Sequence, residues 1–200
     1  MYLIIEGMPS SGKTTLAKAL AGRYQGIYFK SLLPDDSFGD LVRRIRDNTP
    51  DAAESDLLHI VDLFRNECQI AKMLAKEEPV VRDKCFLSSL AHFLSKPPAD
   101  PAVQEAMEAS YRELASVMAE PDALILLDRE LDVSRGMCIR KEDASGLDRE
   151  ILGNPSRFAL QKGYLFAQAR RYFGDRVIVL SGNESLDEEI NIIERTIQSC

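Results

Sequence analysis

The residues best suited to chemistry lie near the start of the chain, in the run Gly7-Met-Pro-Ser-Ser-Gly12-Lys13-Thr14. This run fits the pattern G-x-x-x-x-G-K-[ST], and it stands between an apolar stretch and a helical pattern. The two glycines permit backbone angles that a Cβ forbids. Successive N–H groups can then form an anion-binding concavity at the positive end of the following helix. The pattern therefore predicts a loop that binds the phosphates of a nucleoside triphosphate.

The polar residues of this loop have distinct expected roles. Lys13 supplies a flexible cation for the β- and γ-phosphates, and Thr14 offers a hydroxyl to Mg²⁺, which prefers oxygen ligands. We therefore expect ATP and Mg²⁺ to bind here. A glycine-rich turn without a ligand is the alternative, and the length and context of the motif disfavour it. The residues expected to contact the nucleotide are Gly7, Pro9, Ser10, Ser11, Gly12, Lys13, Thr14 and Thr15.

Composition narrows the class of protein. The chain has 200 residues, enough for one domain with a continuous core, and a formal net charge of -7. That charge argues against a general nucleic-acid binder, which would show a basic face. We see no apolar run of membrane-spanning length and no signal segment, so a cytoplasmic protein is expected. Its four scattered cysteines indicate free thiols rather than disulfides or a metal centre.

Hydrophobic patterning predicts the elements that must position the loop. Short apolar runs alternate with longer amphipathic segments, which is typical of a parallel sheet covered by helices on both faces. We expect an α/β fold of the P-loop NTPase kind, with three α/β/α layers, a five-stranded parallel sheet and a single domain over residues 1–200. Besides the first strand, strands are expected at 26–30, 79–83, 121–128 and 176–180, and helices at 13–24, 38–47, 52–76, 86–93, 102–118, 131–140, 156–173 and 186–197. Residues 141–155 are polar and glycine-containing, as suits a mobile segment.

Ligands of such sheets bind at the carboxyl ends of the strands, where three charged residues are candidates. Asp83 could hold the Mg²⁺ shell or take a proton from a hydroxyl acceptor, and its alternative role is a helix N-cap. Asp128 could assist Mg²⁺ through water, or it could cap a strand end. Lys84 could pair with a phosphate, or it could be an ordinary surface lysine.

Arginines on the predicted helices could stabilise phosphate charge. Arg135 and Arg140 precede the polar segment, so at least one could swing onto the transferred phosphate, although cations at a helix C-terminus are also expected on electrostatic grounds. Arg43 could bind the acceptor, but with Arg44 and Arg46 it could equally form a solvated face. Phe86 could line a base pocket or belong to the aromatic core.

The chain resembles the thymidylate kinase-like branch of nucleoside and nucleotide kinases. Residues 80–92 are similar to that family's D-R-Y-x-x-S-S-x-A-Y stretch, residues 121–128 to its P-D-L-x-x-x-L-D strand and residues 158–165 to its late G-Y-L helix. Residues 131–140 and the polar stretch that follows occupy the place of the lid, about 135–155. The resemblance implies Mg²⁺-dependent phosphoryl transfer from ATP to a nucleoside monophosphate such as dTMP. Members of that family often form dimers, so a homodimer is an expectation from the resemblance, whereas charge and hydropathy are the reasons to expect neither nucleic acid nor membrane as partner.

Within this resemblance, Arg65 sits where the family has an arginine for the acceptor phosphate; an ion pair with Asp62 is the alternative. Other positions depart from the family. Residues 31–37 replace an R-E-P-G-G-T run, Pro9 replaces an acidic loop residue, Val61 replaces an aromatic, and Lys84 replaces the D-R-Y arginine. A kinase of a small-molecule hydroxyl, in a nucleoside or an antibiotic, therefore stays open, as does a nucleotide-dependent regulatory ATPase.

Overall fold

A computed structural model describes residues 1–30, 37–48, 53–96, 100–140 and 145–198. Within these ranges the chain forms a five-stranded sheet in the order β2-β3-β1-β4-β5, with every neighbouring pair parallel. The strands are β1 (Tyr2–Gly7), β2 (Ile27–Lys30), β3 (Val80–Asp83), β4 (Ala123–Leu127) and β5 (Val177–Leu180). The predicted fold class is confirmed, and each expected strand is present.

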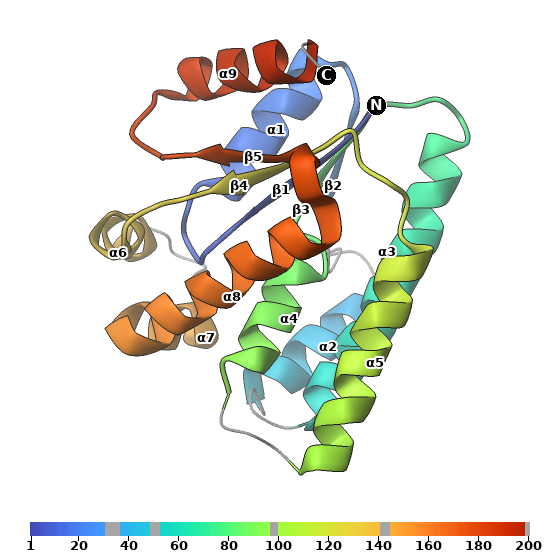
Figure 1. Cartoon of the computed structure of the whole chain (residues 1–200), viewed down its shortest axis with the longest axis vertical. Helices are drawn as coiled ribbons and strands as arrows, with labels where there is room; N and C mark the ends of the chain where they lie inside the picture. The colour runs from blue at the N-terminus through green and yellow to red at the C-terminus, as the bar shows by residue number, and fades with distance from the viewer. Residues whose placement is uncertain (31–36, 49–52, 97–99, 141–144, 199–200) are drawn as a thin grey trace.

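Helices cover both faces of this sheet (Figure 1). On one face lie α1 (Lys13–Arg23) and α9 (Leu186–Gln198), and on the other α3 (Ala53–Leu74), α4 (Leu87–Leu94), α5 (Pro101–Val117) and α8 (Pro155–Phe173). The helix α2 (Ser37–Asn48) packs against α3. Two further helices, α6 (Leu131–Ile139) and α7 (Gly146–Gly153), contact each other beside the carboxyl ends of the strands.

The central strands explain how the two layers form. Successive side chains of a strand point to opposite faces, so Leu3 and Ile5 of β1 enter the core under α1 and α9, while Tyr2 and Ile4 enter the other core. All five residues of β4 are buried in the same alternating way. An apolar strand buried on both faces can occupy only the middle of a covered sheet, which is where β1 and β4 lie.

One prediction about the lid segment is wrong. Residues 146–153 form the helix α7 instead of an irregular stretch, because Ser145 caps its first turn and accepts a hydrogen bond from the Asp148 N–H at 3.0 Å. Ile151 and Leu152 are buried on its inner face. The rest of the predicted segment includes residues 141–144, which lie outside the described residues, as does most of the loop at 31–37.

Cysteine pairing, metal ligation and membrane-spanning length can each be examined in the described ranges. Cys68, Cys85 and Cys138 are free thiols there, and those ranges hold no group of three or more His, Cys, Asp or Glu side chains placed to bind a metal. None of the helices described is both long and apolar enough to cross a bilayer.

Candidate active site

The phosphate loop leaves β1 at Gly7 and enters α1 at Lys13. A Cβ on Gly7 would lie 2.7 Å from the Ser11 Oγ and 3.0 Å from the Leu127 carbonyl oxygen, so only glycine fits against β4 here. Gly12 has a φ of 95°, in the left-handed region that favours glycine. Both glycines of the motif are thus required by the backbone path.

Lys13 points back into this loop. Its ammonium donates to the carbonyl oxygens of Gly7 at 2.8 Å and Met8 at 2.6 Å, and to the Ser11 Oγ at 3.3 Å. The side chain is buried, and burial lowers the pKa of Lys13 to about 7, with the nearby Lys84 charge acting in the same direction. A cation held at low solvent exposure inside an anion-binding loop is suited to pair with a phosphate.

Asp83 ends β3 beside the loop. Its Oδ2 accepts hydrogen bonds from the Thr14 hydroxyl at 2.6 Å and from the Tyr28 hydroxyl at 3.0 Å. The pKa of Tyr28 is raised by burial first and then by the Asp83 charge, so the phenol stays protonated and donates. The residue at the N-cap of α4 is Phe86, which excludes Asp83 from the alternative role of capping that helix.

These two oxygen ligands fit the preferences of Mg²⁺. The Asp83 Oδ1 is buried and has no hydrogen-bond partner within the described part of the chain, and the Thr14 hydroxyl is its neighbour. Asp128 lies elsewhere at the sheet edge and pairs with Lys162 of α8, with 2.5 Å between Oδ1 and Nζ. Its role near a metal stays a prediction, while Asp83 and Thr14 form a ready pair of hard oxygen donors.

Lys84 directly follows this carboxylate. It is exposed and has a φ of 72°, and its backbone N–H donates to the Ile5 carbonyl at 3.1 Å. Since its charge lowers the pKa of Lys13, the two cations share one electrostatic site. Contact of Lys84 with a phosphate stays a prediction.

The acceptor candidates are less closely grouped. Arg65 is half-exposed; its guanidinium forms an ion pair with Asp62 at 3.6 Å and lies 4.6 Å from the centre of the Phe38 ring on α2. The side chain of Arg43 lies outside the described residues. Phe86 is fully buried and packs edge-to-face on Tyr172 at 5.1 Å, which supports its alternative place in the aromatic core over a base pocket.

The two lid candidates are in different situations. The Arg135 Nε donates to the Leu152 carbonyl at 2.7 Å, so this arginine ties α6 to the end of α7. Arg140 is exposed immediately after α6. Contact of either arginine with a phosphate stays a prediction.

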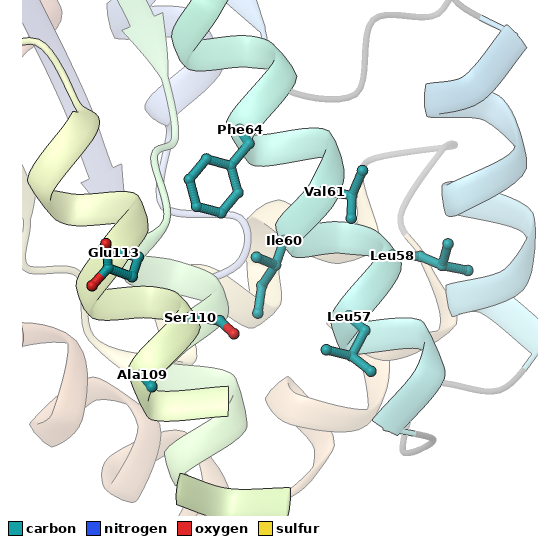
Figure 2. Close-up of a pocket in the computed structure, with 8 residues that line it drawn as sticks. All are labelled: Leu57, Leu58, Ile60, Val61, Phe64, Ala109, Ser110 and Glu113. Carbon is teal, nitrogen blue, oxygen red and sulfur yellow. The ribbon is translucent and has the colours of Figure 1, made fainter. Parts of the chain in front are cut away.

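An apolar groove of about 460 Å³ lies between α3 and α5 (Figure 2). No residue of the phosphate loop lines it, and its lining carries one charged side chain, so it is distinct from the donor site. Val61, in the position of the family's aromatic, forms part of its wall. The lining residues are Leu57, Leu58, Ile60, Val61, Phe64, Ala109, Ser110 and Glu113.

Three side chains that support the site were not predicted. Tyr28 bonds Asp83, and Arg129 reaches the Ser11 carbonyl at 3.2 Å. The fully buried Glu6 accepts from the Cys85 N–H at 2.8 Å and from the Ser88 hydroxyl, so it anchors the start of α4 beneath the loop. A lone carboxylate inside an apolar strand was the available signal for Glu6, and position directly after Asp128 was the signal for Arg129.

Comparison with known proteins agrees with this geometry. No protein-family model matches the chain. It is 26% identical over 138 residues to a probable thymidylate kinase of Thermoplasma volcanium, an alignment that spans 68% of this chain and 70% of that protein.

Solved structures give the same result at the level of the fold. A deoxyadenosine kinase from M. mycoides superposes with a TM-score of 0.75 at 13% identity, covering 100% of both chains. Thymidylate kinase from Candida albicans superposes with a TM-score of 0.74 at 18% identity, covering 99% of this chain and 91% of that one. The chain therefore carries a complete phosphate loop on the fold that these P-loop kinases share. In sequence and fold it is thymidylate kinase-like.

Proposed function

We propose that the protein transfers the γ-phosphoryl group of ATP to the phosphate of a nucleoside monophosphate such as dTMP, with Mg²⁺ as cofactor. The observation that carries this proposal is the contact of Asp83 with Thr14 directly beside the buried Lys13. Phosphoryl transfer asks the protein chiefly for alignment and charge stabilisation. A lysine, a hydroxyl and a carboxylate gathered at one phosphate loop supply that stabilisation.

The donor half follows from the loop. Its N–H groups and Lys13 bind the β- and γ-phosphates. Thr14 and the Asp83 Oδ1, which has no hydrogen-bond partner among the described residues, would hold Mg²⁺, and that ion would neutralise charge on the β- and γ-phosphates. The Tyr28 hydroxyl donates to the Asp83 Oδ2, the same oxygen that Thr14 contacts, and so orients the carboxylate.

The acceptor half rests on the arginines. Arg65 is the proposed grip on the acceptor phosphate, because α3 holds its guanidinium at the surface and a fork-shaped cation can bind two phosphate oxygens. Arg43 and Lys84 are proposed to add charge on the same side. Arg135 and Arg140 are the proposed lid cations that neutralise the transferred group and help to exclude water.

A specific observation favours one alternative, a kinase of a nucleoside hydroxyl. The buried Asp83 Oδ1 has no partner within the described residues, and a hydroxyl acceptor needs a base to take its proton. The superpositions on deoxyadenosine kinase and on thymidylate kinase have nearly equal TM-scores, 0.75 and 0.74. In this alternative Asp83 is a general base, whereas in the main proposal it serves the metal.

One experiment separates these functions. ADP release is measured with ATP, Mg²⁺ and a panel of nucleosides and nucleoside monophosphates, and the product is identified by mass. A diphosphate product formed from dTMP or a related monophosphate supports the main proposal, and a monophosphate formed from a nucleoside supports the alternative. Basal turnover that no acceptor stimulates contradicts both and points to a regulatory ATPase.

The variant Asp83→Asn tests the role of the carboxylate, with the exposed Asp175→Asn as a matched control. If the acceptor is a hydroxyl, Asp83→Asn abolishes turnover at nearly unchanged ATP affinity, because only the base is lost. If the carboxylate serves the metal, the Mg²⁺ concentration needed for half-maximal activity rises. Wild-type activity and Mg²⁺ dependence in Asp83→Asn would contradict both roles.

A further inference from the structure

Arg129 links the phosphate loop to the opposite end of the chain. It is the second residue after β4, and its Nε donates to the Ser11 carbonyl at 3.2 Å. Its Nη2 donates to the Glu189 carboxylate of α9 at 2.6 Å. Both side chains of this ion pair are largely buried, with 13% of the arginine and 3% of the glutamate exposed. A guanidinium committed in this way has a fixed direction, unlike a surface arginine.

The Ser11 carbonyl matters because of the peptide to which it belongs. The carbonyl of Ser11 and the N–H of Gly12 lie in one planar trans unit and point in opposite directions. Gly12 has a φ of 95°, and glycine passes between such conformations at little cost. The Leu16 N–H donates to the Gly12 carbonyl at 3.1 Å and so fixes the peptide that follows Gly12. The peptide between Ser11 and Gly12 is held instead by Arg129, through the Ser11 carbonyl.

The turn between β5 and α9 makes room for this arginine. Gly182 has a φ of 80°, and a Cβ there would lie 2.3 Å from the Arg129 Cδ and 2.6 Å from its Nη1. Lys162 of α8 donates to the Arg129 carbonyl at 3.3 Å and so holds its backbone. The side chain therefore lies in a slot formed by three separate elements.

We infer that Arg129 is a positioning residue: by holding the Ser11 carbonyl, it turns the Gly12 N–H toward the phosphate chain of the donor nucleotide. Glu189 orients the guanidinium, and Gly182 provides the space that it occupies. The inference rests on the proposed function, since it concerns how the loop binds a polyphosphate. It adds α9 and its preceding turn to the parts of the chain that set donor affinity.

The test measures affinity for two probes by titration calorimetry on the full chain: Mg²⁺-ATP and tripolyphosphate, which has the phosphates without the nucleoside. Arg129→Gln removes the contact, and Gly182→Ala displaces the guanidinium while keeping its charge. Both should bind each probe roughly tenfold more weakly, the equivalent of about 1.4 kcal/mol. The matched control is Arg23→Gln, which removes the exposed ion pair of Arg23 with Glu194 on the same helix α9 and should stay within about twofold of wild type.

Two results would overturn the inference. If Gly182→Ala binds both probes as wild type does, the loss in Arg129→Gln is a charge effect and not positioning. If ATP binding falls but tripolyphosphate binding does not, Arg129 contacts the nucleoside instead of the loop. All variants are measured where circular dichroism shows them folded. Failure of the proposed function has a different signature: the wild-type protein would bind both probes but show no acceptor-stimulated ADP release, and the binding comparison would still decide the role of Arg129. A wild-type protein that binds neither probe would overturn the inference as well.

Discussion

The buried ammonium of Lys13 should make the stability of the protein depend on pH in a way that one substitution isolates. Burial lowers the pKa of Lys13 from 10.5 to about 7 in the native state. In the unfolded chain the lysine regains its ordinary pKa of roughly 10.4. Between these values the unfolded state binds a proton that the native state has released. The free energy of unfolding must therefore rise with pH in this window.

The magnitude follows from the two pKa values. A pKa of about 7 in the native state and 10.5 in the unfolded state raises the free energy of unfolding by a total on the order of 5 kcal/mol between low and high pH. The rise is complete above pH 10.5. Between pH 7 and pH 9 the same linkage gives a rise of about 2 kcal/mol. Below pH 7 both states are protonated, so the contribution of Lys13 to the pH dependence ends there.

The assay is urea unfolding without nucleotide at pH 7, 8 and 9, for wild type and for Lys13→Met. Methionine keeps much of the side-chain volume without the titrating group, so the difference between the two proteins cancels the other titrations. The exposed Lys76→Met is the control and should follow the wild-type curve. Parallel pH dependence in wild type and Lys13→Met would refute the reasoning, since it would show that Lys13 titrates alike in both states.

Two predictions concern the frame around the site. Arg82→Met should destabilise the protein by about 3–5 kcal/mol in urea unfolding, because Arg82 and Glu67 form a buried ion pair at 2.5 Å and the carboxylate would lose its partner. The double variant with Glu67→Met should recover most of that loss, and a double variant as unstable as the single one would contradict this account. Ser145→Ala should remove the cap of α7 at a cost of about 1 kcal/mol and speed amide exchange in that helix; unchanged exchange there would show that the cap does not hold it.

Most of the fold could be predicted because its signals are local. The uninterrupted apolar run of β4 marks an inner strand, and the phosphate-loop motif marks the junction between β1 and α1. The helix α7 was missed although Ser145 and Asp148 stand at capping positions, since Gly146 and Gly153 made the segment look irregular. The strand order was not predicted, because it depends on how distant strands pair.

The site residues likewise fall into those with a local sequence signal and those whose roles depend on distant contacts. Residues of the loop were identified from spacing alone, and Asp83 from its place at a strand end. Tyr28 and Arg129 were missed because their roles exist only through contacts with residues 55 and 118 positions away. For Phe86 the sequence left a base pocket and the aromatic core as alternatives, and only the packing of its ring against Tyr172 in the core distinguishes them.

The ion pair of Arg65 with Asp62 does not oppose its proposed role at the acceptor. The Asp62 carboxylate is buried and Arg65 is partly exposed, and their 3.6 Å separation is long for a charged hydrogen bond. A phosphate brings more charge and accepts two parallel N–H bonds from one guanidinium. A phosphate could therefore compete with Asp62 for the Arg65 guanidinium, while Asp62 keeps the Asn66 amide at 3.2 Å. The proposed donor residues make their contacts within the fold, whereas the proposed role of Arg65 requires a bound phosphate, so the acceptor assay is the measurement that decides it.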